Sequence, residues 1–220
     1  MPSVLITGAN RGIGLEFARQ YAADGWDVVA TARDPGKADE LNALGVRVEP
    51  LDMADLDAVI AFADRIKSLD LLIANAGTND PMNAVTLDDA KRWAKMMAVN
   101  AIGPFMLARG LLPKAAASTG KLIAITSGMG SLSDTSGGWI PYRTSKAALN
   151  MGWRSLALEA RAQNVVMAML SPGWVKTRMG GAGAEITPEE SVGAMRGLID
   201  RLTIDQTGKF LRRDGSEIPW

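Results

Sequence analysis

The chain has 220 residues, 47% of them hydrophobic, which is enough for one domain with a sizeable core. Lys plus Arg and Asp plus Glu number 24 each, so no excess charge favours nucleic acid or a membrane as a partner. The chain has no cysteine and no histidine, which excludes disulfides, thiolate catalysis, the usual zinc ligands and the usual general base. Any acid–base chemistry therefore depends on Tyr, Lys, Asp or Glu.

Short apolar runs alternate with amphipathic segments along the whole chain. Uninterrupted apolar runs are typical of strands covered on both faces, and their alternation with helices favours a parallel sheet with right-handed crossovers. The sequence predicts a single α/β domain over residues 1–220, a doubly wound Rossmann fold with a mainly parallel seven-stranded sheet and helices on both faces. Strands are expected at 4–7, 27–31, 46–51, 71–74, 121–126, 165–170 and 208–211, and helices at 13–23, 37–44 and 142–158, with a further helix opening at 188–190.

The first apolar run is too short for a signal peptide, because it begins at Val4 and meets Gly8, and no basic leader precedes it. No stretch approaches the ~18 consecutive apolar residues of a membrane span. A cytoplasmic protein with no membrane partner is therefore expected.

A glycine-rich turn joins the first predicted strand to the first helix. Glycines let the backbone approach a pyrophosphate, and the free N–H groups at a helix start attract an anion. A dinucleotide site is therefore predicted here, the alternative being a tight turn without a ligand. The turn comprises Gly8, Asn10, Arg11, Gly12, Ile13 and Gly14.

The end of the second strand indicates which dinucleotide is bound. In the common pattern an acidic residue there binds the adenosine ribose, but this chain has Thr31-Ala32-Arg33, and the first carboxylate is Asp34. Arg33 and Arg11 would suit a 2′-phosphate, which favours NADP over NAD. The alternative is that both arginines are solvated surface charges.

Tyr142 and Lys146 lie four residues apart and share a face of a predicted helix that has Pro141 near its start. An ammonium group about 5 Å from a phenol, at an effective dielectric constant of ~20, favours phenolate by roughly 3 kcal/mol, or about 2 pKa units. That shift would bring the phenol into the range of general acid and base catalysis. The alternative is an ordinary surface pair.

Six motifs in this order resemble the short-chain dehydrogenase/reductase family, and they span nearly the whole chain. Thr31-Ala32-Arg33 and the ending from Asp214 to Trp220 resemble its carbonyl-reductase branch, which includes sniffer-type and C-factor-like proteins. The motifs are Thr7-Gly-x-x-x-Gly-x-Gly14, Asn75-Ala76-Gly77, Asn100, Ser127, Tyr142-x-x-x-Lys146 and Pro172-Gly173.

The resemblance implies four catalytic residues. Tyr142 would be the general acid and base, and Ser127 at the end of the fifth strand would bind the substrate oxygen, although as a serine before a glycine it is equally a turn residue. Lys146 would lower the pKa of Tyr142 and bind the nicotinamide ribose. Asn100 would sit at a local distortion of its helix and hold a water that relays protons through Lys146.

The resemblance also implies a set of cofactor contacts. Asp52, with Met53 beside it, would bind the adenine amino group, the alternative being a cap for the helix that starts near Asp55. The Val175 backbone would meet the carboxamide. The full predicted set is Gly8, Asn10, Arg11, Gly12, Ile13, Gly14, Arg33, Asp52, Met53, Asn75, Ala76, Gly77, Tyr142, Lys146, Pro172, Gly173, Val175 and Thr177.

The substrate is expected to be a small carbonyl compound or secondary alcohol. Only residues 178–187 separate the Pro-Gly turn from the next helix, where relatives usually have a lid, so a short substrate region at about 178–190 and an open site are expected. Four apolar residues near the catalytic positions are the candidate substrate contacts, although packing elsewhere is the alternative for each. They are Met129, Trp139, Trp174 and Met179.

Two functions remain open from the sequence. The first is an NADP-dependent reductase, and the second is a dinucleotide-binding signalling or regulatory protein of C-factor type with little turnover. The complete set of catalytic residues favours the first. A homodimer or higher homo-oligomer is expected because Leu149, Met151 and Trp153 add apolar surface to the helix of Tyr142.

Overall fold

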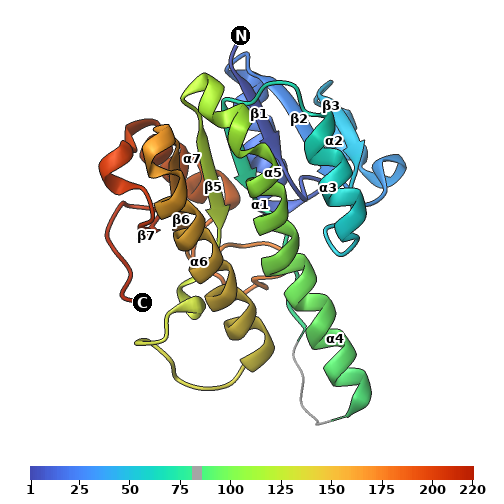
Figure 1. The fold of residues 1–220 in the computed structure, drawn as a ribbon. Helices are drawn as coiled ribbons and strands as arrows, with labels where there is room; N and C mark the ends of the chain where they lie inside the picture. Colours follow the sequence, from blue (N-terminus) through green and yellow to red (C-terminus); the bar gives the residue numbers. More distant parts are fainter. Residues whose placement is uncertain (81–85) are drawn as a thin grey trace.

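The computed structural model describes residues 1–80 and 86–220, and in them seven strands form one parallel sheet (Figure 1). The strand order is β3-β2-β1-β4-β5-β6-β7, which confirms the predicted doubly wound α/β fold. The strands are β1 Ser3–Ile6, β2 Asp27–Ala32, β3 Arg47–Pro50, β4 Leu71–Ala74, β5 Lys121–Ile125, β6 Val166–Ser171 and β7 Phe210–Arg212.

The order of the strands reverses between β1 and β4. The chain proceeds from β1 outward through β2 to β3, then returns to place β4 on the other side of β1, where Leu5 is level with both Val29 and Leu72. In open parallel sheets the crevice at such a reversal, at the carboxyl ends of the strands, is where ligands bind.

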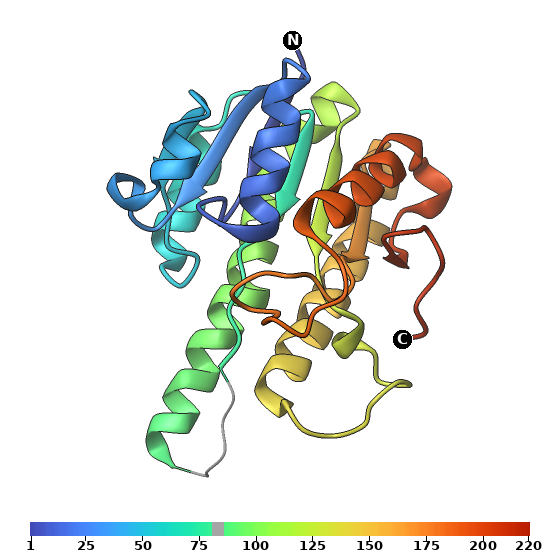
Figure 2. The ribbon, with the colours of Figure 1, turned by 180° about the vertical axis from the view of Figure 1, so that it is seen from behind.

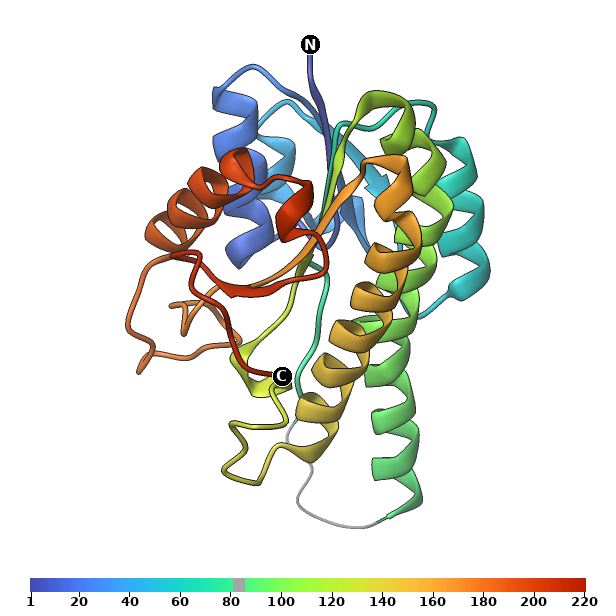
Figure 3. The ribbon, with the colours of Figure 1, turned by 60° about the vertical axis from the view of Figure 1, so that its left-hand side comes forward.

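Helices cover both faces of the sheet, and alternate strand residues enter two separate cores. Leu5 and Leu72 belong to the core under one face, whereas Ile6 and Ile73 belong to the other. Figure 2 shows α1 and α7 in front of the sheet, and Figure 3 shows the two layers from the side. The first layer contains α1 Gly12–Ala23, α2 Asp39–Asn42 and α7 Pro188–Arg201, and the second α3 Leu56–Arg65, α4 Leu87–Met97, α5 Gly103–Ser118 and α6 Ile140–Ala160.

Two helices of the second layer reach far beyond the carboxyl ends of the strands (Figure 1). One is α6, and the other runs from Leu87 to Ser118 through α4, a π-helical segment at Ala98–Ile102 and α5. By length and composition the second could cross a membrane, but half of its apolar window is buried inside the fold, as in a core helix that packs on a sheet. The extensions of α4 and α6 therefore lie on the side of the carboxyl edge of the sheet, where the candidate active site is described below.

Two sequence predictions about helices are wrong. In place of a helix over 37–44, the structure has a short 3₁₀ turn at Pro35–Lys37 and the four-residue α2. Pro35 and Gly36 precede that segment and belong to the 3₁₀ turn, and Gly45 ends the segment with a left-handed φ of 68°. The second error concerns α6, in which Leu149 and Trp153 are buried in the core and so add nothing to an intermolecular surface.

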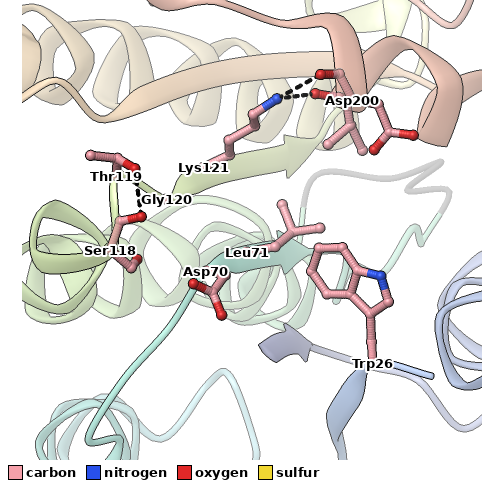
Figure 4. Close-up of a pocket in the computed structure, with 9 residues that line it drawn as sticks. Trp26, Asp70, Leu71, Ser118, Thr119, Gly120, Lys121 and Asp200 are labelled. Carbon is pink, nitrogen blue, oxygen red and sulfur yellow. Dashed lines mark hydrogen bonds between the residues drawn. The ribbon is translucent and has the colours of Figure 1, made fainter. Parts of the chain in front are cut away.

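A hollow of about 150 Å³ lies at the opposite edge of the sheet, near the amino ends of β4 and β5 (Figure 4). The Lys121 ammonium crosses it and donates to the carbonyl oxygens of Ile199 (2.5 Å) and Asp200 (3.1 Å) in the last turn of α7. Such bonds satisfy carbonyl groups that a helix leaves unpaired at its end. Lys121 therefore has a structural role away from the predicted catalytic residues.

Candidate active site at the carboxyl edge of the sheet

The glycine turn after β1 is held against the end of β4. Asn75 Nδ2 donates to the carbonyl oxygens of Thr7 (3.0 Å) and Gly8 (3.1 Å), and the Thr7 hydroxyl accepts from the backbone N–H groups of Asn75 and Ala76. Gly8 has a φ of 65°, and a Cβ there would lie 2.8 Å from Ala76 Cα; a Cβ on Gly14 would lie 2.5 Å from Asn75 Nδ2. Only glycine fits at these two positions, so the turn is a tightly packed unit.

The first turn of α1, directly after the glycine turn, has no side-chain cap. Side chains cap α3, α4 and α7 through Asp55, Thr86 and Thr187, whereas Arg11 at the start of α1 makes no side-chain cap bond and no acidic residue lies in the first turn. The first N–H groups of α1 are therefore not bonded by a cap, and the helix dipole adds positive potential there. The predicted dinucleotide turn, including exposed Asn10 and half-buried Ile13, has the geometry that suits a pyrophosphate.

Two exposed arginines lie beside this turn. Within residues 1–80 and 86–220, neither Arg11 nor Arg33 takes part in an ion pair. Asp34, the nearest carboxylate in the sequence, is paired with Lys37 at 2.8 Å, and the hydrogen bond from Lys37 lowers the pKa of Asp34. Asp34 is thus engaged elsewhere, which leaves two cations for an anionic ligand.

The predicted adenine contacts lie after β3. The Asp52 carboxylate accepts from the backbone N–H of Ala54 (2.9 Å), and Met53 is buried. The hypothesis that Asp52 caps the next helix is wrong, because Asp55 does so by accepting from the Ala58 N–H at 3.0 Å. The second oxygen of Asp52 makes no hydrogen bond within the described residues.

Tyr142 and Lys146 lie in the first two turns of α6. The half-buried Tyr142 ring has its centroid 5.9 Å from Lys146 Nζ, and the buried ammonium donates to the carbonyl oxygen of Ile125 at 3.0 Å. Burial lowers the pKa of Lys146 to about 8. The two side chains are therefore neighbours at the end of β5, as their spacing predicts.

The expected lowering of the Tyr142 pKa by Lys146 is wrong for this arrangement. Burial raises the pKa of Tyr142, and a hydrogen bond with Ser127 opposes the rise in part. Desolvation disfavours phenolate more strongly than the ammonium favours it, since Lys146 is itself desolvated and points to the Ile125 carbonyl. The phenol is consequently protonated at neutral pH, which is the state that a proton donor requires.

Ser127 occupies the turn position that the sequence offered as an alternative, and it lies next to Tyr142. It begins the 3₁₀ turn Gly128–Gly130, where its Oγ accepts from the Met129 N–H at 3.2 Å, and its interaction with the neighbouring phenol partly offsets the rise in the pKa of Tyr142. The turn is fixed to β6 by a hydrogen bond of 3.1 Å from the Gly128 N–H to Ser171 Oγ. Ser127 is thus both a turn residue and a partner of the phenol.

Asn100 lies buried in the π-helical segment, the helix distortion that the resemblance implied. Its amide exchanges two 2.8 Å hydrogen bonds with the backbone of Thr78 and donates to Ser145 Oγ at 3.0 Å. A Cβ on Gly77 would lie 3.5 Å from Asn100 Oδ1 and 3.6 Å from Lys146 Nζ, so the two side chains flank the bare Gly77 backbone.

The sequence did not single out Ser145 and Ser171, which hold Asn100 and the Ser127 turn respectively. Ser145 also donates to the Tyr142 carbonyl oxygen at 2.8 Å, an ordinary bond for a helical serine. The position of Ser145 between Tyr142 and Lys146 could have marked it as a site residue. The position of Ser171 immediately before the Pro172-Gly173 motif could have done the same.

Residues 173–187 form a folded segment in place of a long lid. Val175 bridges to Ile186, the Lys176 N–H donates to Ile186 O at 2.8 Å, and Thr177 Oγ1 accepts from the Gly180 N–H at 3.1 Å. The Pro172 carbonyl accepts from Ser191 Oγ at 2.7 Å, so Gly173 starts this segment from a fixed point. A Cβ on Gly12 would lie 3.2 Å from Thr177 Cγ2, which places this segment against the glycine turn.

The four apolar residues predicted to contact substrate do not line one hollow. Trp139, Trp174 and Met179 are 47%, 54% and 44% exposed, whereas Met129 lines a hollow of about 220 Å³ between the loop after Ser127 and α6. The role of these four residues as substrate contacts stays a prediction. Trp174 is held by a hydrogen bond from its indole N–H to Gly180 O at 2.8 Å, and so its ring is fixed while exposed.

Together these groups support a specific chemistry. An uncapped helix start and arginines without an ion pair among the described residues suit a nucleotide, and a protonated phenol next to Ser127 can exchange a proton with a substrate oxygen. The consecutive residues Ala76 and Gly77 connect the two regions, because Ala76 packs on Gly8 and Gly77 lies beside Lys146.

Comparison with known proteins agrees with this geometry. The model of the short chain dehydrogenase family matches residues 2–185. The protein named C-signal from Myxococcus xanthus is 38% identical over 164 residues, which cover 73% of this chain and 99% of that one.

Solved structures show the same fold over the full length. The carbonyl reductase Sniffer of D. melanogaster is 30% identical with a TM-score of 0.92, and the alignment covers 100% of both chains. The NADPH-bound carbonyl reductase from chicken fatty liver is 34% identical with a TM-score of 0.90, covering 100% of this chain and 99% of that one. The family model, the relatives and the site geometry agree that this chain belongs to the short chain dehydrogenase family of oxidoreductases.

Proposed function

We propose that this protein is an NADP(H)-dependent reductase of small carbonyl compounds, with Tyr142 as general acid. The observation that carries the proposal is the half-buried, protonated phenol next to Ser127 and Lys146, on the edge of the sheet that also has the uncapped start of α1. The similar reductase from chicken fatty liver is described as NADPH-bound, which supports the choice of cofactor.

The residues of the glycine turn fit a dinucleotide on their own geometry. Gly8 and Gly14 leave no room for a side chain, the first N–H groups of α1 lack a cap, and Arg11 and Arg33 are exposed cations. Asp52 would bind the adenine, and Val175 and Thr177 would hold the nicotinamide end. When bound, the reduced nicotinamide supplies the hydride for the substrate carbon.

The mechanism of this chain's residues follows from their protonation states. Tyr142 donates its proton to the carbonyl oxygen as hydride reaches the carbon, so the oxygen becomes a neutral hydroxyl rather than an alkoxide. Ser127 provides a second hydrogen bond to that oxygen. Lys146 and Asn100, on either side of Gly77, would return a proton to Tyr142 from a water molecule between them. In alcohol oxidation Tyr142 accepts the proton instead.

The cofactor preference rests on Arg33, so its removal is the test. Arg33→Ala is expected to raise KM for NADPH by about tenfold, because a charge-assisted phosphate contact is lost, and to leave KM for NADH nearly unchanged. Steady-state kinetics with both cofactors measures this. Arg109→Ala, which removes an exposed arginine paired with Glu159 elsewhere on the surface, is the control. An equal loss with both cofactors would contradict the assignment.

The substrate class is tested by assaying aldehydes, quinones and diketones with NADPH and following the loss of nicotinamide absorbance. We propose residues 178–190 as the substrate region, with Trp174 and Met179 exposed beside an open site. Turnover of several apolar carbonyl compounds supports the reductase. Tight NADPH binding without turnover of any member would contradict it.

The similarity to C-signal favours a second candidate, a dinucleotide-binding signalling protein with little turnover. It predicts NADPH affinity in the same range as for the reductase but no rate above background with every carbonyl tested. The placement of Tyr142 next to Ser127 and Lys146 favours the reductase, since nucleotide binding alone does not need a phenol at this position.

We also propose that the protein forms a homodimer through the outer face of α6, and we keep a cytoplasmic location as a prediction. Ile140, Met151 and Leu158 on this helix are 57%, 65% and 54% exposed, and a two-fold axis would bring each copy's stripe onto the other's. Met151→Glu is expected to convert a dimer into a monomer without loss of folding. Light scattering measures the mass, and a monomeric wild type would end this proposal.

A further inference from the structure

Residues 217–220, here called the tail, fold back along the last strand and end beside the loop that follows Ser127 (Figures 1 and 3). Glu217 forms an antiparallel bridge with Leu211, and the Ile218 N–H donates to Phe210 O at 2.8 Å. Ile218 is buried. The tail thus has a fixed path from β7 to the carboxyl edge of the sheet.

Two hydrogen bonds join the tail to that loop. The buried Ser131 donates its hydroxyl to Pro219 O at 2.6 Å, and the Ser133 N–H donates to Trp220 O at 2.8 Å. Ser131 is only four residues from Ser127, and the connection is short and stiff. The Ser131 N–H bonds to Gly128 O at 3.0 Å, and the Gly130 N–H bonds to Ser127 O at 2.9 Å.

The Trp220 ring anchors the tail to the body of the protein. The Trp220 ring makes two contacts. Its centroid lies 5.6 Å from that of Phe210, a buried residue of β7, and 4.7 Å from the Arg154 guanidinium. Arg154 belongs to α6, the helix of Tyr142, and is itself held by a hydrogen bond to Gly208 O at 3.2 Å. Trp220 therefore contacts β7 and α6 through its ring, and the loop after Ser127 through its carbonyl oxygen.

We propose that Trp220 is a positioning residue for catalysis, which holds the loop 127–133 so that the Ser127 hydroxyl stays against Tyr142. This inference rests on the proposed reductase function. It assigns no contact between Trp220 and substrate or cofactor, and its effect passes through Ser131 and Ser133. Small displacements of positioned groups cost catalytic rate much more than they cost binding.

The test compares three variants with the wild type by steady-state kinetics at a temperature where each is fully folded. Trp220→Ala is expected to lower kcat for carbonyl reduction by about tenfold with KM for NADPH unchanged, and Trp220→Phe, which keeps a ring on Phe210 and Arg154, to restore most of it. Glu217→Ala is the matched control in the tail, because its exposed side chain pairs with Lys209 and is not bonded to the loop. Its kcat should equal that of the wild type.

Coupling to Ser131 separates positioning from general loosening. If the tail acts through Ser131, the Trp220→Ala and Ser131→Ala effects overlap, and the double variant is no slower than the slower single variant. The proposal would be overturned if the fold-losses in kcat of the two single variants multiplied in the double variant, or if folded Trp220→Ala kept the wild-type kcat.

Hydrogen exchange provides a readout that does not need turnover. The amides of residues 127–133 should exchange faster in Trp220→Ala than in Glu217→Ala, and equal rates would overturn the positioning role. If the wild type reduces no carbonyl, the proposed function fails while this measurement still decides whether the tail holds the loop.

Discussion

Tyr142→Phe is expected to lower kcat for carbonyl reduction by about 10³-fold, because it removes the proton donor and general acid catalysis is commonly worth 10²–10⁴. At about 1.4 kcal/mol for each factor of ten, this loss corresponds to roughly 4 kcal/mol of transition-state stabilisation. Affinity for NADPH should change little, since the ring remains. Single-turnover kinetics and NADPH fluorescence titration measure the two quantities separately.

The chain provides a matched control in its only other tyrosine. Tyr21 is buried between α1 and α7, burial raises its pKa to about 12, and the Arg196 guanidinium lies 4.4 Å from its ring. Tyr21→Phe removes the same atom from a site away from the carboxyl edge, so activity should be unchanged. Retention of wild-type turnover in Tyr142→Phe would end the mechanism proposed here.

Lys146→Met is expected to reduce turnover and NADPH affinity together while changing how stability depends on pH. Burial lowers the pKa of Lys146 from 10.5 to about 8, so between these values the unfolded state binds more protons and wild-type stability rises with pH. The lowered pKa corresponds to a stability gain of about 3 kcal/mol between pH 7 and pH 10.5. The methionine variant should lack this gain.

The difference in stability between Lys146→Met and the wild type should therefore change sign as the pH rises. At pH 7 the variant is expected to be about 1–2 kcal/mol more stable, because a desolvated charge has gone and only the hydrogen bond to Ile125 is lost. Near pH 10.5 it is expected to be less stable by a similar amount. Urea unfolding of the nucleotide-free protein at several pH values measures the difference.

Lys121→Met is the control for that experiment. Burial lowers the pKa of Lys121 too, but its ammonium bonds to the end of α7 at the opposite edge of the sheet (Figure 4). The control should retain both turnover and NADPH affinity. A Lys146→Met variant that keeps full activity would contradict the catalytic assignment of Lys146.

The order of apolar runs was sufficient to predict the sheet. β4 begins and ends where its apolar run does, and the other strands differ by one or two residues at one or both ends, because the central strands are covered on both faces and are therefore mostly apolar. The segment at 37–44 was mispredicted because helical spacing is a weak signal beside Pro35 and Gly36.

The motifs likewise identified the residues that meet at the carboxyl edge, since parallel strands bring the ends of β1, β4 and β5 together. Spacing along the sequence was insufficient to predict the direction of the Tyr142 pKa shift. It placed Lys146 next to Tyr142 but could not show that both groups are desolvated, and that burial, rather than the nearby charge, dominates the pKa of Tyr142. It was also insufficient to tell that Leu149 and Trp153 face the core.

Local chemistry and periodicity in this sequence therefore determined the family and the parallel fold and predicted a catalytic set, because those depend on residue type and on spacing along one chain. The tertiary structure alone decided which side chains lose water, which apolar residues stay outside, and that residues 217–220 reach the loop of Ser127. These features depend on contacts between segments far apart in the sequence, and solvent exposure and charge interactions follow from such contacts.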